Sequence, residues 1–359
     1  MNRALLVVGT AAAMALGAST VASAATARQG TTSVAGVEVG PQSSWPTGLD
    51  NRGDVVGAYT AASGTRGYVW RGGAYTDLGV LNGGDYTYAT GVNDGGAVVG
   101  YSGDFAAATG VQAFEWRDGT MAELPGLGGN SFAGQINDSG LIDGAAATAS
   151  GQSYAVLWRD GKLTELPGLG GSSSGPVAMN AAGQVAGYSS TASGDEDAVL
   201  WTDGKITDLG PGQVIALNDR GEVLVQVSPV SGPSYVFLWD DGKKTDLPAG
   251  AFANGLNDQG QVVGDYTPAG ATTQDGFVWQ RGALTDLGTE NPVAINDRGQ
   301  ILAVTDDNGL YDSVVLDHGA TITLTPTSGT SATPAFISDS GWVAGETEAT
   351  ASATAWQLH

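Results

Sequence analysis

The sequence repeats one short phrase, Asn-Asp-x-Gly or a close variant, along almost its whole length. The phrase reads "GVNDGGAVVGY" at 91–101 and "GLNDQGQVVGDY" at 255–266. Successive phrases lie 38 to 44 residues apart, measured between their closing glycines: Gly53, Gly96, Gly140, Gly183, Gly221, Gly260, Gly299 and Gly341. Periods near 40 residues are typical of solenoids, helical arrays and propellers. The chain is therefore predicted to contain eight repeat units.

A second marker counts the same units independently. An apolar run in each unit ends on one large residue, at Trp70, Trp116, Trp158, Trp201, Trp239, Trp279, Leu316 and Trp356. These positions are 37 to 46 residues apart, in step with the glycine series. Seven of the eight are tryptophan, and only the seventh unit has leucine.

The pattern inside one unit predicts four β-strands. Residues 133–168 contain four short pieces, "AGQIN", "LIDGAAA", "YAVLW" and "KLTELP", separated by turn sequences. The pieces are too short for helices, hold no 3.6-residue period and are bounded by glycine. An Asp-Gly turn such as "RDG" at 117–119 follows the third piece in most units, and its glycine supplies the positive φ of a two-residue hairpin.

The distribution of residue sizes favours a propeller over a solenoid. The first strand of each unit is rich in Ala and Gly and the third carries Trp, as expected when inner strands are crowded at an axis and outer strands are not. The last unit ends after its third strand, and residues 32–40, "TSVAGVEVG", resemble the missing fourth. We therefore expect an all-β, eight-bladed β-propeller of four-stranded antiparallel blades, whose last blade is closed by this N-terminal strand.

The first residues are typical of a secretory signal. Residues 1–24 hold one cation, Arg3, then an uncharged apolar run and small residues at Ala22 and Ala24, the pattern of a cleavage site. The predicted organisation is a signal peptide at 1–24, a linker at 25–31 and a single propeller domain at 32–359. The mature protein is expected to be secreted and extracellular, without membrane insertion, because no later apolar run reaches about 20 residues.

Charge and composition narrow the classes of partner. Without Arg3 the chain has 13 basic and 37 acidic residues, so its net charge is 13 − 37 = −24. This charge repels phosphate backbones and anionic lipid, which argues against nucleic acid and membrane surfaces as partners. The sequence has no cysteine, so no disulfide or thiol chemistry is available. High charge serves solubility, and attraction of a cation or a basic partner is the alternative.

The repeat phrase resembles a known family. The pattern A-x-x-I-N-D-x-G-x-V-x-G, followed by A-F-x-W-x-D-G and T-D-L-G, is similar to the HAF-type extracellular repeats of bacterial secreted proteins, and its layout resembles WD-repeat propellers. The resemblance covers the mature chain and implies export and a β architecture, but no defined activity. Departures occur where "NAA" at 180–182 lacks the Asp, Val225 replaces a Gly and Leu316 replaces Trp.

The repeated phrase is interpreted as scaffolding. In a four-stranded blade it lies on the face of short, uniform turns, where Asn and Asp cap local backbone amides and Gly adopts a positive φ. Repeated calcium sites are the alternative, but each phrase offers two adjacent polar side chains and calcium takes six to eight oxygens. No metal site and no other cofactor is therefore predicted.

The sequence offers few residues of two types that often catalyse reactions, His and Cys. The only histidines are His318 and His359, so neither a Ser-His-acid triad nor a His-rich zinc site can be assembled, and no catalytic residue is predicted. A carboxylate pair acting on glycosides remains an alternative. A purely structural surface protein is the third reading.

The opposite face carries the longer, variable loops, where binding usually resides. We expect a monomeric, non-catalytic binding or interaction module that recognises an extracellular glycan or protein through this face. Its candidate ligand-binding residues are the acids and aromatics of these loops and the strand ends beside them: Asp85, Tyr86, Tyr88, Phe105, Asp195, Glu196, Asp197, Tyr266, Asp306 and Asp307.

Overall fold

The computed structural model describes residues 32–104, 110–268, 270–307, 310–329, 331–347 and 351–358. The predicted signal peptide and linker lie outside this part. The described residues form β-strands with one 3₁₀ turn, η1 (Leu81–Gly83), and contain no α-helix. It follows that none of these residues belongs to a helix able to cross a bilayer. The prediction of an all-β chain is confirmed.

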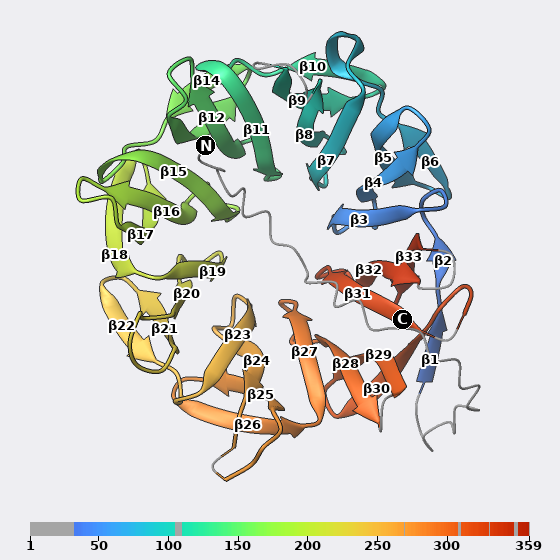
Figure 1. Cartoon of the computed structure of the whole chain (residues 1–359). Coiled ribbons are helices and arrows are strands. Elements are labelled where there is room, and N and C mark those ends of the chain that lie inside the picture. Colours follow the sequence, from blue (N-terminus) through green and yellow to red (C-terminus); the bar gives the residue numbers. More distant parts are fainter. Residues whose placement is uncertain are drawn as a thin grey trace.

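The strands follow the sequence repeats around a central opening (Figure 1). Before the first unit come β1 (Thr32–Ala35) and β2 (Val37–Glu38). Units one and two contain β3 (Ser44–Leu49), β4 (Val55–Ala61), β5 (Gly64–Arg71), β6 (Ala74–Asp77), β7 (Tyr86–Val92), β8 (Val98–Gly103), β9 (Val111–Arg117) and β10 (Thr120–Glu123). Units three and four contain β11 (Gly128–Ile136), β12 (Ile142–Thr148), β13 (Ser153–Arg159), β14 (Lys162–Glu165), β15 (Gly170–Met179), β16 (Val185–Thr191), β17 (Glu196–Thr202) and β18 (Lys205–Pro211).

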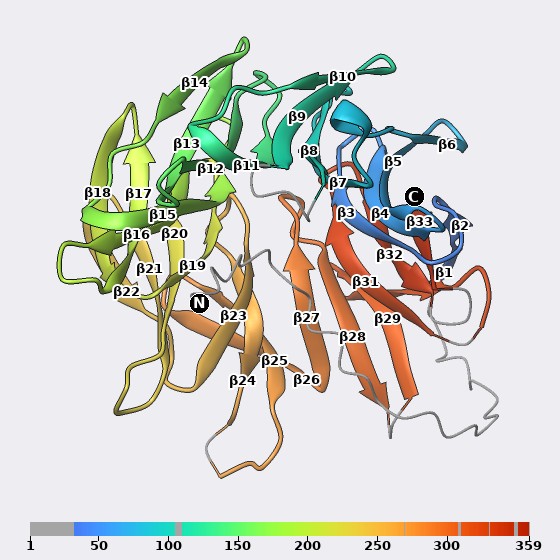
Figure 2. The same ribbon diagram turned by 45° about the horizontal axis from the view of Figure 1, so that its top comes forward.

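The second half of the ring continues in the same order. Units five and six contain β19 (Gln213–Leu217), β20 (Val223–Val227), β21 (Tyr235–Asp240), β22 (Lys243–Asp246), β23 (Ala251–Leu256), β24 (Val262–Tyr266), β25 (Asp275–Gln280) and β26 (Ala283–Gly288). Units seven and eight contain β27 (Glu290–Ile295), β28 (Ile301–Asp307), β29 (Leu310–Asp317), β30 (Ala320–Thr325), β31 (Ala332–Ile337), β32 (Trp342–Thr347) and β33 (Ser352–Gln357). Figure 2 shows these sheets from a tilted viewpoint, standing side by side around the ring.

Within each unit, successive strands pair antiparallel as meanders, and the first strand lies nearest the centre. Five sheets have four strands each. Units three and four share an eight-stranded sheet, because Ser153 of β13 makes a single parallel pairing with Ser173 of β15. The strand β15 is ten residues long, and its early residues thereby reach the neighbouring unit.

The N-terminal segment adds strands to two units rather than one. β2 pairs antiparallel with β33, as predicted for the fourth strand of the last unit. β1 instead runs parallel to β30 and becomes the fifth strand of unit seven. The single strand predicted for residues 32–40 is thus divided at Gly36, whose N–H donates to the carbonyl of Thr325 at 2.9 Å. Val39, just after β2, is fully buried.

The hairpin turns after the third strands have the predicted two-residue form, with positive φ at both central residues. The glycine was expected to supply the positive φ, and Gly119 has φ 83°. The residue before it has a positive φ as well, 50° at Asp118 and 51° at Asp160. Two consecutive positive φ values are the signature of a type I′ turn, whose twist matches that of the flanking strands. Asp tolerates this conformation better than most side chains.

The core lies between units rather than inside them, in seven buried hydrophobic clusters. One cluster, for example, joins Val99 and Leu124 of unit two to Ile142 and Trp158 of unit three. Trp158 is fully buried, and its indole Nε1 donates to the carbonyl of Pro125 at 2.7 Å. Trp158 therefore packs at the interface between two units.

Candidate binding site

Five aromatic side chains from the first three units form a cluster beside the central opening. Tyr86 and Tyr88 project from β7, and Tyr88 is paired across the sheet with Tyr101 of β8. The rings of Tyr88 and Tyr101 are stacked, with centroids 5.5 Å apart and planes 15° from parallel. Tyr86 stacks on both, at 6.3 Å from Tyr88 and 5.9 Å from Tyr101. Alternation along one strand explains why residues two apart share a face.

Neighbouring units complete this cluster, which we call the aromatic cluster. Trp45 of β3 donates its indole N–H to the hydroxyl of Tyr88 at 3.0 Å, with ring centroids 6.3 Å apart. Phe132 of β11 packs edge-on against Tyr101 at 5.0 Å. The same register position in three successive first strands is occupied by Trp45, Tyr88 and Phe132. In each strand, the next residue is paired with a Gly of the second strand. The cluster therefore arises from one strand position repeated around the ring.

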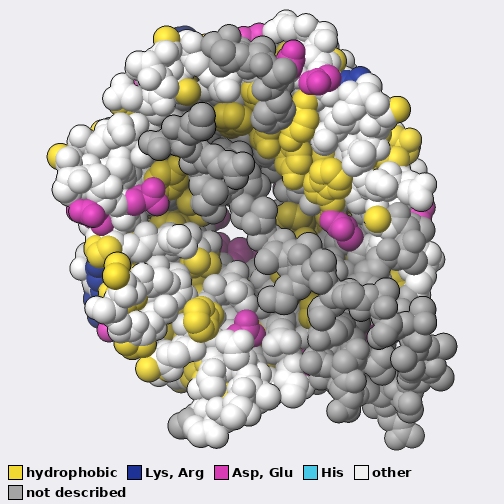
Figure 3. Space-filling view, in the orientation of Figure 1, with side chains coloured by type: hydrophobic (Ala, Val, Ile, Leu, Met, Phe, Trp, Pro, Cys, Tyr) yellow, Lys and Arg dark blue, Asp and Glu magenta, His cyan; other side chains and the backbone are white. Residues whose placement is uncertain are grey.

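The cluster is open to solvent only in part. Tyr101 is 6% exposed, whereas the other four members are half-buried. Burial raises the pKa of Tyr86, Tyr88 and Tyr101, so all three hydroxyls stay protonated at neutral pH. Figure 3 shows hydrophobic side chains gathered beside the central opening over β7. The result is an apolar surface with protonated hydroxyl groups within it.

A carboxylate lies next to the aromatic cluster. Glu346 of β32 belongs to unit eight and is half-buried, and burial raises its pKa. It is near enough to Tyr88 for its charge to contribute to the raised pKa of that tyrosine, after the larger effect of burial. The cluster and Glu346 thus draw side chains from four consecutive units, eight, one, two and three.

The other predicted site residues are dispersed. Asp85 precedes Tyr86 and is exposed. Asp195 accepts a hydrogen bond from Ser193 at 2.8 Å, within its own turn. Glu196 and Asp197 lie at the start of β17 in unit four, where burial raises both pKa values. Glu196 is close to Tyr188, whose pKa its charge helps to raise.

The remaining candidates lie farther along the chain. Tyr266 packs edge-on against Phe277 of its own unit at 6.0 Å. The backbones of Asp306 and Asp307 belong to β28, and Phe105 lies outside the described residues. The structure thus brings together Tyr86 and Tyr88 but adds Trp45, Tyr101, Phe132 and Glu346, which sequence reasoning missed. For Trp45 and Phe132, the sequence signal that could have been used is their position directly before the residue that pairs with the second-strand Gly, a position which they share with Tyr88.

The repeated phrase forms a second ring, at the opposite end of the opening. The carboxylate of Asp94 accepts the N–H of Asn51 in the preceding unit at 2.9 Å, and Asp258 accepts that of Asp219 at 2.7 Å. Equivalent bonds reach Asp138, Asp219, Asp297, Asp339 and, through its amide oxygen, Asn51. The caps predicted to be local thus cross between units at the second position. The first-position Asn caps its own turn, where the Oδ1 of Asn93 accepts the N–H of Ala97 at 3.0 Å, and its Nδ2 donates to the next unit.

This polar ring surrounds a cavity of about 410 Å³ lined by residues of all eight units. The second-position carboxylates accept backbone N–H groups across the units, whereas the first-position carboxylate of Asp50 accepts from its own turn. Within the described part of the chain, no three His, Cys, Asp or Glu side chains are grouped closely enough to hold a metal ion. The geometry fits the interpretation of the phrase as scaffold.

Comparison with known proteins identifies the fold. No family model matches the sequence, and no curated protein matches it. The β-propeller domain of the trilobed protease from Pyrococcus furiosus, described as having an open velcro topology, superposes with a TM-score of 0.51 at 10% identity, over 76% of this chain and 94% of that one. The fold is a β-propeller. Each repeat unit can accordingly be described as a blade.

Two further solved structures resemble this propeller more distantly. A puromycin-hydrolysing peptidase from Mycobacterium tuberculosis has a TM-score of 0.49 at 14% identity, over 78% of this chain and 55% of that one. YCF48 bound to a D1 peptide has a TM-score of 0.46 at 9% identity, over 90% and 96% of the two chains. At these identities the likeness concerns the fold alone.

Proposed function

We propose that the chain is an exported, eight-bladed propeller that binds glycans non-catalytically through the aromatic cluster. The pairing of β2 with β33 and the bond from Asp339 to Asn51, which both join the ends of the ring, support closure with eight blades. The resemblance to HAF-type repeats agrees with export. The observation that carries the binding proposal is the stacking of Tyr86, Tyr88 and Tyr101 beside the opening.

The chemistry of the cluster suits a sugar. Sugar rings have an apolar face bordered by hydroxyl groups, and aromatic side chains with polar edges offer both contacts at once. The hydroxyl of Tyr88 accepts from Trp45 and can donate its own proton to a sugar oxygen, and the carboxylate of Glu346 can accept from sugar hydroxyls. The tyrosines and Trp45 are already packed against one another, so little side-chain freedom is lost on binding.

The test is a glycan screen followed by titration calorimetry on folded variants. Replacing Tyr86 and Tyr88 together by Ala should weaken binding by at least about 1 kcal/mol, the loss expected of contributing interface residues. The matched control is Phe252→Ala. Phe252 is paired with Asp265 in the register that joins Tyr88 to Tyr101, but it lies across the ring and is 46% exposed. Equal losses in both variants would contradict the proposed site.

A glycoside-active enzyme is a second candidate because of one feature. Glu346 is a half-buried carboxyl beside the aromatic cluster, and burial raises its pKa, as expected of a general acid. Glu346→Gln would abolish sugar release by an enzyme. In a binding module no sugar is released by either form, and Glu346→Gln changes only the affinity.

Export is tested separately. Expression in a secreting host, followed by N-terminal sequencing of the protein from the medium, should give a mature chain that begins at Ala25, after the pattern Ala22-Ser23-Ala24. Retention of Met1 on a cytoplasmic product would contradict export without affecting the proposed glycan site.

A further inference from the structure

One interface of the ring lacks the buried cluster that the others have. The seven clusters join blades one and two, two and three, three and four, four and five, five and six, seven and eight, and eight and one. Among the described residues, no such cluster joins blades six and seven. This is the interface where Leu316 stands in the position that tryptophan occupies in every other blade.

The register confirms that Leu316 and the tryptophans are equivalent. Leu316 of β29 pairs with Ile301 of β28, just as Trp158 pairs with Ile142 and Trp201 with Val185. Trp158 and Trp201 are at most 2% exposed, whereas Leu316 is half-buried. Leucine is much smaller than an indole, so this position is left underfilled.

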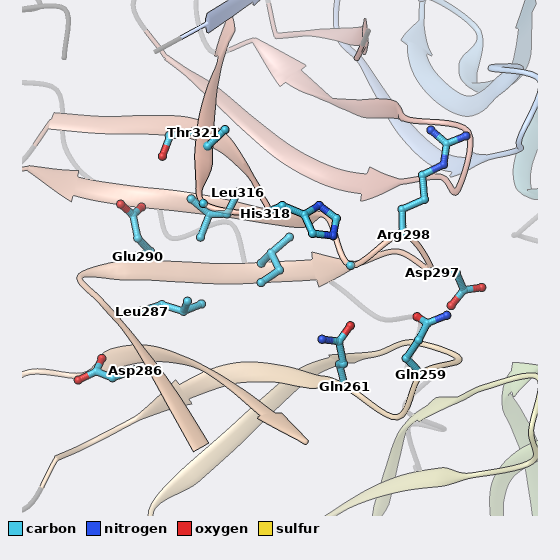
Figure 4. A pocket seen from close by; sticks show the side chains of 14 residues that line it. Gln259, Gln261, Asp286, Leu287, Glu290, Asp297, Arg298, Leu316, His318 and Thr321 are labelled. Atoms are coloured by element: carbon cyan, nitrogen blue, oxygen red, sulfur yellow. The ribbon is translucent and has the colours of Figure 1, made fainter. Parts of the chain in front are cut away.

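The space beside Leu316 is a cavity of about 730 Å³, within the usual size range of small-molecule sites. Leu316, Ile301 and Leu287 give it an apolar wall, and Figure 4 shows Leu287 and Leu316 on facing strands. Leu287 is half-buried. Its equivalents in other blades, such as Leu124 and Leu166, are 4% and 3% exposed because a tryptophan covers them. The cavity therefore includes the space that an indole fills at the other interfaces.

Three of the filled interfaces show a contact that such an indole can make. The Nε1–H groups of three tryptophans donate to carbonyls of the preceding blade, at 2.7 Å for Trp158, 2.7 Å for Trp201 and 2.8 Å for Trp356. Each acceptor lies at the end of that blade's outer strand or two residues beyond it. The acceptors are the residues directly after a buried Leu, namely Pro125, Pro167 and Thr325. The corresponding residue in blade six is Gly288, directly after Leu287.

We propose that the cavity between blades six and seven is a binding site for a small aromatic molecule of indole type, which takes the place of the missing tryptophan ring and donates its N–H to the carbonyl of Gly288. The apolar wall beside Leu316 favours an aromatic ligand, because burial of apolar surface is favourable and this wall is already formed. This site is separate from the aromatic cluster and does not depend on the proposed glycan binding.

The polar rim sets a preference for ligand charge. Asp286 and Glu290 lie at one end of the cavity, and Asp297 and Arg298 at the other (Figure 4). The side chain of Arg298 reaches toward the carbonyl of Ser340 in blade eight, at 3.5 Å, rather than into the cavity. The rim therefore has three carboxylates and one guanidinium, and its net charge is negative. A cationic indole should bind more tightly than an anionic one.

The test is binding of free indole, measured by titration calorimetry and by saturation-transfer NMR. Indole should bind the wild-type protein saturably, and Leu316→Trp should weaken that binding at least about tenfold by filling the cavity. Leu316→Phe is a smaller change that should also weaken indole binding. It replaces Leu316→Trp in the test if the tryptophan variant folds poorly. Tyr88→Ala is the matched control, since it disrupts the other aromatic surface and should leave indole binding unchanged.

Ligand analogues test the chemistry. Benzofuran, which has the shape of indole without its N–H, should bind several-fold more weakly, and tryptamine should bind more tightly than indole-3-acetate. Absence of saturable indole binding at millimolar concentration would overturn the proposal, as would undiminished binding to both Leu316 variants or a loss confined to Tyr88→Ala. Equal affinity for benzofuran would overturn the hydrogen bond assigned to Gly288.

Discussion

The backbone N–H of Asp339 donates to the side-chain oxygen of Asn51 at 3.0 Å, across 288 residues of sequence. This bond links the turn of the last repeat to the turn of the first. It continues the series in which Asp258 accepts from Asp219 and Asp297 accepts from Asp258, each at 2.7 Å. The series has one gap, because Ala181 offers no side-chain oxygen to the N–H of Asp138.

The gap gives a matched pair of variants. Asp258→Ala removes the acceptor of the exposed Asp219 N–H and should cost about 0.5–1.5 kcal/mol of unfolding free energy, as for the loss of one hydrogen bond. Ala181→Asn supplies an acceptor without adding charge, as Asn51 does, and should stabilise by about 0.5–1 kcal/mol. Urea denaturation measures both. If the two variants change stability in the same direction, the turn ring does not hold the blades together.

The repeat tryptophans should contribute unequally to the free energy of unfolding. Trp158→Ala removes a fully buried indole together with its bond to Pro125 and should cost about 3–5 kcal/mol. Trp239 is half-buried, so Trp239→Ala should cost clearly less. Chemical denaturation of the two variants side by side is the measurement, and equal losses would show that burial at this position does not set stability.

Two buried carboxyls make stability depend on pH. Burial raises the pKa of Asp143 to about 7 and that of Asp50 to about 6, both above the ordinary value of 3.8. The native state therefore binds these protons more tightly than the unfolded state. Their stabilising effect is complete below the unfolded pKa and is lost as pH rises through about 6 to 7. Unfolding free energy should thus be higher at pH 5 than at pH 8, by about 2–3 kcal/mol from Asp143.

Substitutions at these positions test the origin of that effect. Asp143 stands where the second blade has Val99, and its Oδ2 has no hydrogen-bond partner. Asp143→Val should stabilise the protein at pH 8 and lose that advantage by pH 5. Asp50 occupies the position in blade one that Asn93 occupies in blade two, where the Asn side chain donates to the next blade. Asp50→Asn should therefore also stabilise the protein at pH 8 and lose that advantage by pH 5. A pH profile that is unchanged in the double variant would assign the dependence to other groups.

The N-terminal strands should stabilise the ring of blades. A chain shortened to begin at residue 41 loses β1, β2 and the buried Val39, and exposes the edge of β33. An unpaired edge strand promotes association with other chains. We expect a lower melting temperature and concentration-dependent aggregation by light scattering. A truncated protein as soluble and stable as the parent would contradict this role.

The fold was largely predictable because it is repeated. Eight copies of one pattern average out local exceptions, and glycine marks turns through its positive φ, as at Gly119. The split of residues 32–40 at Gly36 was not predictable, since either neighbouring blade offers an open edge. The aromatic cluster was predicted only at Tyr86 and Tyr88. Trp45 and Phe132 join it through cross-blade packing that depends on strand register, which local pattern does not reveal.

The meeting of β2 with β33 has a consequence for the connectivity of the ring. Because the first and last strands are neighbours, the blades follow one another in a cyclic order. The chain can therefore begin at another blade without changing that order. A circular permutant, with its ends joined by a short linker and a new opening at the exposed hairpin of Gly161, should reach the same arrangement of blades. The repeated turns would then specify the fold without reference to any particular first blade.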